Sequence, residues 1–229
     1  MTIELHQNRP PAYRDELPSS LADINAEHLN GLVDRLLVDE AAAGQSRIHG
    51  PGLVVWITGL SGAGKTTVAG LLAPCFQEAG RPCVTLDGDH LRALLRNELG
   101  LETGHDREQR LTLARLYGRL CQAVATRGCD VLCATVSMFH DVRAWNRAHI
   151  PNYLEVYLRV PLDELRRRDP KGLYARSAAG EVAGMVGVEV PAEEPSRPDL
   201  VIDHHPDRTP AVTAHDIWRT IRERHAARG

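Results

Sequence analysis

The sequence predicts an α/β domain with a mainly parallel sheet that is covered by helices on both faces. A short apolar run at residues 53–57 ends in a glycine-rich turn, and a helical stretch follows from residue 65 to about residue 79. The same alternation of a buried strand and a helix recurs along the chain, which is the pattern of βαβ units and parallel strands. A length of 229 residues is enough for one well-cored domain and a modest extension.

The remaining elements follow from apolar runs and helical periodicity taken in chain order. The pattern predicts further strands at 83–86, 130–136, 153–160 and 200–202. It predicts helices at 89–99, at 107–127, from about residue 140, and at 209–226, with a helix–loop–helix segment at 162–180.

The N-terminal part is of a different kind. Residues 1–18 contain three prolines and little periodicity, which indicates an extended arm. Ser19 and Ser20 are suited to cap a helix that continues to about residue 43, and a linker is expected at 44–52. We therefore expect an N-terminal arm and helix over residues 1–50 and a folded domain over residues 51–229.

The composition excludes several functional classes. The net charge is −3 and no basic block is present, so neither a nucleic-acid partner nor a membrane partner is predicted. No apolar run approaches the ~20 residues of a membrane span, and the N-terminus lacks the pattern of a signal peptide, so a cytoplasmic location is expected. The five cysteines form no CxxC pair and are typical of buried, reduced thiols.

Residues 59–66 match the phosphate-binding pattern GxxxxGK[ST] between a predicted strand and a predicted helix. Glycines let the backbone point several N–H groups at phosphate oxygens, and the following helix adds its positive end. Lys65 is expected to reach the β- and γ-phosphates of ATP, and the Thr66 hydroxyl to bind Mg²⁺. The predicted nucleotide-binding residues are Gly59, Ser61, Gly62, Ala63, Gly64, Lys65, Thr66 and Thr67.

This motif predicts a P-loop NTPase-type three-layer αβα domain, but it does not choose a reaction. GTPases, ATPase motors and small-molecule kinases share it. No NKxD-type guanine-reading sequence is present and the chain is short for a motor domain, which favours a small kinase.

The second predicted strand ends in Asp87-Gly88-Asp89. Ligands of open parallel sheets bind at the carboxyl ends of the strands. One carboxylate would accept the proton of an attacking hydroxyl, and the other would position Mg²⁺-bound water. The plainer alternative is an aspartate that caps the next helix.

Arginine occurs 25 times and lysine only twice, at Lys65 and Lys171. A compact ammonium cannot be replaced by a planar guanidinium at every site, so the two retained lysines are candidates for phosphate contacts. Lys65 lies in the phosphate loop and Lys171 lies in the motif RDPKGLY at 168–174.

Five motifs together resemble adenylyl-sulfate kinase in order and spacing over residues 50–205. They are GLSGAGKTT, LDGDHLR, the Asp-Arg at 106–107, RDPKGLY and PDLVID at 198–203. The resemblance implies an enzyme that phosphorylates a nucleotide 3′-hydroxyl with MgATP, carries a helical lid at about 162–190, and forms a homodimer.

The resemblance also implies roles for individual residues. Asp89 would be the acceptor-side base or orienting carboxylate, Lys171 would close over the phosphates of both substrates, and Arg168 would begin the lid and contact ATP. The implied acceptor site consists of Asp87, Asp89, Arg92, Leu101, Arg107, Arg110, Ser137, Met138, Phe139, Arg143, Lys171 and Met185. For Arg143, as for Arg147, the alternative is ordinary surface charge at helical spacing.

The sequence departs from the family pattern where the acceptor's base would lie. Leu101 and Met185 stand near the two places where the family has phenylalanines that clamp an adenine, and Arg110 replaces an asparagine. Stacking on an aromatic ring is worth roughly 1–3 kcal/mol per base, so an altered acceptor pocket is expected. The stretch from Ser137 to Arg147 resembles a divergent branch that includes cytidine diphosphoramidate kinase, and a cytidine acceptor of that kind is predicted.

Three alternatives stay open at this point. The first is a true adenylyl-sulfate kinase that holds the base with other side chains. The second is a nucleotide-binding regulatory protein without activity, which the retention of Asp89, Lys65, Thr66 and Lys171 disfavours. The third is a kinase of a small metabolite, which Arg92 and Arg107 disfavour if both face the acceptor, because two arginines suit an anionic group.

Overall fold

A computed structural model of the chain describes residues 18–42, 50–103 and 106–226. It contains a five-stranded sheet in which every paired strand is parallel, in the order β2-β3-β1-β4-β5. The strands are β1 (Val54–Thr58), β2 (Cys83–Asp87), β3 (Asp130–Thr135), β4 (Tyr153–Arg159) and β5 (Leu200–Asp203). The α/β class and the parallel sheet predicted from the sequence are confirmed.

The central strand β1 is packed on both faces, which explains its unbroken apolar run from Val54 to Ile57. Val54 and Trp56 belong to the hydrophobic cluster on one face of the sheet, and Val55 and Ile57 belong to the cluster on the other face. Successive side chains of a strand point to opposite faces, so a strand that is covered on both sides needs an unbroken apolar run. All five residues of β1 are buried.

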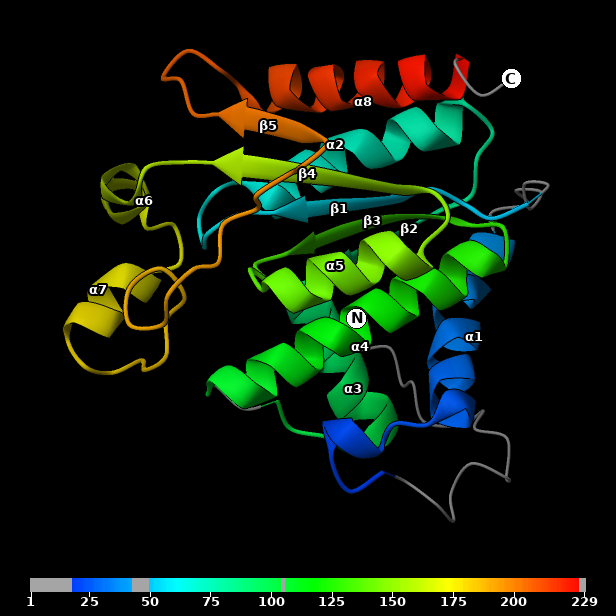
Figure 1. The fold of residues 1–229 in the computed structure, drawn as a ribbon, viewed down its shortest axis with the longest axis horizontal. Coiled ribbons are helices and arrows are strands. Elements are labelled where there is room, and N and C mark those ends of the chain that lie inside the picture. The colour runs from blue at the N-terminus through cyan, green and yellow to red at the C-terminus, as the bar shows by residue number, and fades with distance from the viewer. Residues whose placement is uncertain (1–17, 43–49, 104–105, 227–229) are drawn as a thin grey trace, which may run out of the picture.

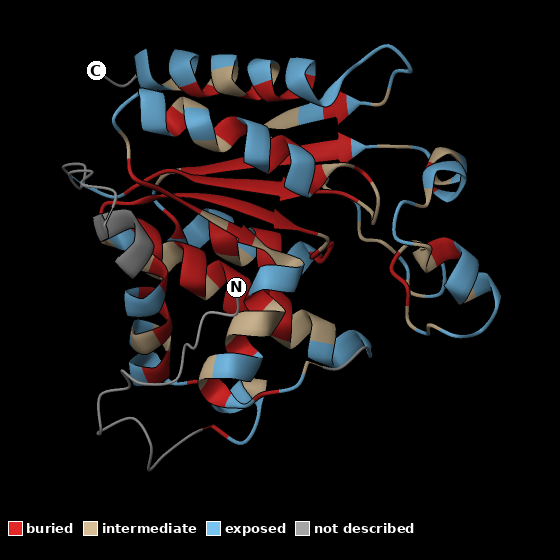
Figure 2. Ribbon diagram, turned by 180° about the vertical axis from the view of Figure 1, so that it is seen from behind, coloured by how far each residue is buried: buried red, intermediate tan, exposed pale blue. Residues whose placement is uncertain are grey.

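The helices form two layers around the sheet (Figure 1). Helices α2 and α8 pack against each other and cover one face, whereas α1, α3, α4 and α5 cover the other. Figure 2 shows the buried surfaces of both layers turned toward the sheet. The main helices are α1 (Ala26–Ala42), α2 (Lys65–Glu78), α3 (Gly88–Leu99), α4 (Arg107–Thr126), α5 (His140–His149) and α8 (Pro210–Ala226).

The N-terminal helix differs from its prediction. Ser20 caps only a short 3-10 turn at Leu21–Asp23, and α1 begins after Asn25. The Asn25 Oδ1 accepts a hydrogen bond from the His28 backbone N–H at 3.0 Å, so asparagine provides the cap. Leu32 of α1 is buried in the cluster that α1 shares with α4. Residues 1–17 of the predicted arm and residues 43–49, which include most of the predicted linker at 44–52, lie outside the described residues.

Two short helices, α6 (Leu162–Arg168) and α7 (Leu173–Ala178), follow β4 at the end of the sheet where the strand arrows point (Figure 1). Between them Asp169 has a φ of +26°, and its carboxylate accepts hydrogen bonds from the N–H groups of Tyr174 and Ala175. Residues 180–199, which we call the lid-return segment, lead back to β5.

None of the helices in the described ranges has both the length and the apolar character needed to cross a bilayer.

Candidate active site

The phosphate loop lies between β1 and α2, at the carboxyl end of the central strand. Gly64 precedes α2 with a φ of +91°, a conformation that favours glycine, and no side chain caps the helix. The first N–H groups of α2 therefore face outward from an uncapped helix end, which is the arrangement that binds phosphate. Gly59, Ser61, Gly62 and Ala63 complete the loop.

Lys65 is the buried cation of this loop. Its Nζ donates a hydrogen bond to the Leu60 carbonyl oxygen at 2.8 Å, and the residue is 9% exposed. Burial, assisted by the charge of Lys171, lowers the pKa of Lys65 to about 7. A bound triphosphate would place negative charge beside this buried ammonium and favour its charged form.

The first turn of α2 exposes Thr66 and Thr67. Their position suits the predicted Mg²⁺ site, because this ion keeps several waters and is held by few protein groups plus substrate phosphates. Among the described residues no cluster of three or more His, Cys, Asp or Glu side chains is placed to hold a metal on its own. The residues present therefore fit a metal that enters with the nucleotide.

Asp89 lies at the start of α3, directly after β2, and is held by two cations. Its Oδ2 accepts from the Lys171 Nζ at 2.7 Å, and its Oδ1 accepts from Arg92 at 2.5 Å. These hydrogen bonds, that of Lys171 first, lower the pKa of Asp89 below its usual value. Lys171 comes from the α6–α7 connection, so this ion pair joins the two motifs that contain Asp89 and Lys171.

Asp87 caps α3. Its Oδ1 accepts hydrogen bonds from the backbone N–H groups of Asp89 at 3.0 Å and His90 at 2.7 Å. The capping alternative is therefore confirmed for Asp87, and the structure assigns it the task of fixing the turn that presents Asp89. Its contact with a substrate stays a prediction.

Arg107 begins α4 and is held from two sides. It donates a hydrogen bond to the Glu193 Oε1 at 2.8 Å, and its guanidinium carbon lies 5.6 Å from the ring centre of Phe139. Arg110 follows one helical turn later. Burial, and then the charge of Arg92, lower the pKa of Arg110, whereas Asp106 and Glu189 act in the opposite direction.

The segment after β3 forms a buried wall. Ser137 is buried and its hydroxyl is 2.6 Å from that of Thr135. Met138 is buried against Tyr157 and Val186. These residues lie at the carboxyl edge, but whether they touch an acceptor stays a prediction.

Arg143 is not ordinary surface charge. Its side chain is only 6% exposed and its Nε is 3.2 Å from the Glu155 Oε1, and its contact with a substrate stays a prediction. Burial raises the pKa of Glu155 and lowers that of Arg143 even though the two charges attract. Arg147, on the same helix, pairs with Glu155 at 2.9 Å and with Asp199 at 3.1 Å.

Leu101 and Met185, predicted to flank the acceptor's base, lie in different hydrophobic clusters. Leu101 is buried with side chains of α3 and α4. Met185 is buried with Leu165 and Tyr174 of the lid. The structure therefore places these two side chains in separate clusters, and their role in binding stays a prediction.

The lid is fastened to the phosphate loop. The Tyr174 hydroxyl donates a hydrogen bond to the Ser61 carbonyl oxygen at 2.9 Å. Arg168, predicted to contact ATP, is instead paired with Glu164 at 2.6 Å and lies within 3.1 Å of the His204 ring. The ATP contact of Arg168 stays a prediction.

Comparison with known proteins agrees with this geometry. The family model of adenylylsulphate kinase matches residues 51–203. The chain belongs to the adenylyl-sulfate kinase family. It is thus an ATP-dependent phosphotransferase of the type that acts on an alcohol group.

Two relatives and one solved structure illustrate the similarity to this family. An adenylyl-sulfate kinase of Chloroflexus aurantiacus is 46% identical over 149 residues, which are 65% of this chain and 78% of that protein. One of Picosynechococcus sp. is 38% identical over 149 residues, which are 65% and 82% of the two chains. The structure of the Mycobacterium tuberculosis APS kinase CysC in complex with AMPPNP and APS superimposes with a TM-score of 0.67. It is 34% identical and covers 76% of this chain and 99% of that one.

Sequence reasoning missed two contacts of this kinase site. Tyr174 belongs to the RDPKGLY motif but has no predicted role, and Glu193 is not among the predicted site residues. A local signal for Tyr174 is Asp169, five residues earlier, whose carboxylate accepts from the N–H groups of Tyr174 and Ala175 in the first turn of α7, although Gly172 holds the N-cap position. Glu193 pairs with a residue 86 positions away, and nothing local to it indicates that partner.

Proposed function

We propose that the chain transfers the γ-phosphate of ATP to the 3′-hydroxyl of adenylyl sulfate. The observation that carries the proposal is the convergence on Asp89 of the lid's Lys171 and the acceptor-side Arg92, beside a phosphate loop with a buried lysine. Relatives from Chloroflexus aurantiacus (46% identical) and Picosynechococcus sp. (38% identical) support this acceptor, because they are named adenylyl-sulfate kinases.

On the donor side, the uncapped start of α2 and Lys65 would bind the β- and γ-phosphates. The transferred group passes through a loose transition state in which positioning and charge neutralisation do most of the work. When bound, Mg²⁺ would neutralise charge on the β- and γ-phosphates, and the Thr66 hydroxyl would hold it there.

On the acceptor side, Asp89 would orient the 3′-hydroxyl and take its proton late in the reaction. A carboxylate whose pKa is lowered by Lys171 and Arg92 is ionised at neutral pH but is a weak base. A loose transition state does not require a strong base, because the hydroxyl becomes acidic only as its bond to phosphorus forms. Arg92 and Arg107 would bind the anionic 5′ group of the acceptor.

The Lys171–Asp89 ion pair has to be exchanged when substrates bind. Both side chains are more than 60% exposed, and exposed ion pairs contribute about 0–1 kcal/mol. Breaking it therefore costs little, and Lys171 would then move to the phosphates while Asp89 turns to the hydroxyl.

The cytidine acceptor predicted from the sequence receives no support from the comparisons, and it is kept as an outcome of the test. The test is steady-state ADP formation with MgATP and either adenylyl sulfate or cytidine diphosphoramidate, with the site of phosphorylation read by phosphorus NMR. We expect turnover with adenylyl sulfate and its loss in Asp89→Asn. Turnover with the cytidine nucleotide alone would overturn the acceptor but keep the reaction.

We also propose a homodimer with no nucleic-acid or membrane partner. Light scattering after gel filtration measures the molar mass of the protein. A monomeric mass at micromolar concentration would contradict the proposed homodimer.

A further inference from the structure

Glu193 is anchored more firmly than its place in a connecting segment would suggest. Its Oε2 accepts from the backbone N–H of His140 at 2.6 Å, which is the first residue of α5. Its backbone carbonyl accepts from the Arg143 Nη2 at 2.6 Å, and its N–H donates to the Met138 carbonyl at 3.2 Å. The remaining carboxylate oxygen, Oε1, is thereby held in place to accept from Arg107.

Arg107 depends on this contact for its orientation. Its side chain is 58% exposed, whereas that of Glu193 is 28% exposed. The guanidinium lies over the face of the Phe139 ring. This contact restrains the distance between the two groups but does not fix the rotation of the guanidinium. A charge-assisted hydrogen bond is directional, so Glu193 fixes the direction in which the free edge of the guanidinium points.

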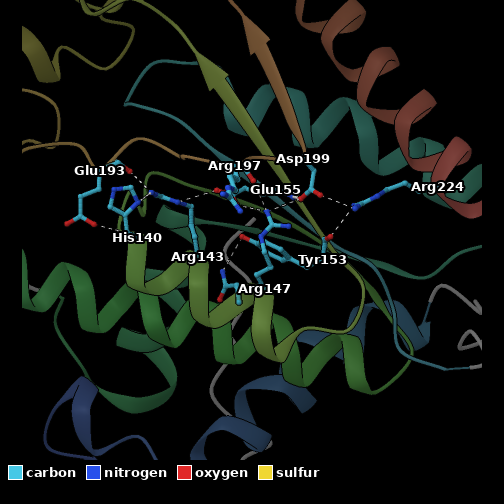
Figure 3. A network of polar contacts seen from close by, with 10 residues as sticks. His140, Arg143, Arg147, Tyr153, Glu155, Glu193, Arg197, Asp199 and Arg224 are labelled. Atoms are coloured by element: carbon cyan, nitrogen blue, oxygen red, sulfur yellow. Dashed lines mark hydrogen bonds and ion pairs between the residues drawn. The ribbon is translucent and has the colours of Figure 1, made fainter.

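Behind Glu193 a chain of ion pairs connects it to the sheet (Figure 3). Arg143 bridges the Glu193 carbonyl and Glu155 of β4. Glu155 in turn bonds Arg147, and its backbone N–H donates to Asp199 at the end of the lid-return segment. Both ends of the region from Glu193 to Asp199 are thus tied to β4.

The buried pair at the centre of this chain is costly. In the part of the chain that the structure describes, Arg143 Nη1 and Glu155 Oε1 are buried without a hydrogen-bond partner. Buried ion pairs of this kind add little net stability, and their known use is to fix one arrangement over others. What this pair fixes here is the position of the Glu193 backbone.

We propose that Glu193 is a positioning residue of the acceptor site, which acts through Arg107 and is itself held in place by Arg143. The proposal rests on the proposed function, in which Arg107 binds the anionic 5′ group of the acceptor. Arg143 thereby takes part in the acceptor site without contacting the acceptor.

The test is a double-mutant cycle on Glu193 and Arg107 with adenylyl sulfate and MgATP as substrates. We expect Glu193→Gln to raise the KM for the acceptor about ten-fold, the usual size of a lost charge-assisted contact, with kcat and the KM for ATP changed less than about two-fold. In the Arg107→Gln background the same change should raise the KM no further. Glu193→Asp, which keeps the charge, should recover part of the loss.

Asp216→Asn on α8 is the matched control, because its side chain is 20% exposed and accepts from Arg208 at the same 2.8 Å. It should leave all three kinetic constants unchanged. Independent losses in the double variant, or an equal rise in the KM for ATP, would overturn the proposal. If Glu193→Gln does not fold, Glu193→Asp and Arg107→Gln carry the comparison.

A second readout separates this proposal from the proposed function. The guanidinium ¹⁵N resonances of Arg107, identified by their loss in Arg107→Gln, should be sharp in the wild type and in Asp216→Asn. They should broaden in Glu193→Asp and Glu193→Gln without any acceptor present. Arg107 resonances that stay sharp in both Glu193 variants would overturn the positioning role. If the wild type shows sharp Arg107 resonances but no turnover of adenylyl sulfate, only the proposed function is overturned.

Discussion

The buried ammonium of Lys65 makes the ligand-free protein less stable than it would be with an uncharged side chain. Lys65 starts α2, where the helix end is itself positive, and its Nζ donates a hydrogen bond to the uncharged Leu60 carbonyl. Its pKa of about 7 lies 3.5 units below the ordinary value of 10.5. We predict that Lys65→Met stabilises the ligand-free protein while abolishing kinase activity.

The magnitude follows from the two pKa values. The unfolded chain holds the proton up to pH 10.5 and the folded chain only up to about pH 7, so folding releases a proton between these values and stability rises with pH. At pH 7 the charge costs about 4 kcal/mol, and at pH 9.5 about 1 kcal/mol. Subtracting about 1 kcal/mol for the lost hydrogen bond leaves a net gain of about 3 kcal/mol at pH 7 and almost none at pH 9.5.

Urea unfolding of the wild type and of Lys65→Met at pH 7 and pH 9.5 measures this gain, and thermal unfolding at pH 7 should show a Tm higher by about 6–12 °C. Lys171→Met is the control, since an exposed lysine should change stability by less than about 1 kcal/mol. A gain of equal size at both pH values, or a less stable variant, would refute the argument that the charge is the cause.

Three further predictions concern other parts of the structure. Asp89→Asn should lower kcat by about 10²–10⁴ in steady-state assays, yet shift the free energy of unfolding by less than about 1 kcal/mol, because its ion pairs are exposed. Tyr174→Phe removes the hydrogen bond to the Ser61 carbonyl, and amide hydrogen exchange in α7 should become about five-fold faster, as expected for the loss of about 1 kcal/mol. Gly118→Ala would place a Cβ 2.2 Å from the Asn146 Oδ1 between α4 and α5, and urea unfolding should show a loss of about 1–3 kcal/mol.

The parts of the fold that the sequence predicted are those with a local signal. The buried run of β1 and the glycines after it specify a strand, a turn and a helix within a dozen residues. The N-terminal helix was placed too early because Ser20 and Asn25 are both good caps, and only packing distinguishes them. Asn25 precedes the residues of α1 whose apolar side chains meet α4, so the helix starts there.

The acceptor site was harder to predict because its contacts join distant segments. Arg143 sits on α5 at a spacing typical of surface charge, and its burial follows from Glu155 on the neighbouring strand β4. Glu155 faces the α5 side and is the one charged side chain in the buried part of β4, which is the local sign that a cation has to meet it. The contact between Arg107 and Glu193 has no such sign, since it depends on the path of the lid-return segment.

We propose that the base of the acceptor is held by two parts of the protein that pack in different hydrophobic clusters. Leu101 is packed with α3 and α4, and Met185 is packed with the lid, so the width between them depends on where the lid stands. The lid is held at the phosphate loop by Tyr174 and at Asp89 by Lys171, and the second of these contacts is exposed and weak. Substrates that draw Lys171 away from Asp89 would move the lid at the same time as they free the carboxylate. On this proposal acceptor binding and lid movement are coupled, because the same contact between Lys171 and Asp89 has to open for both.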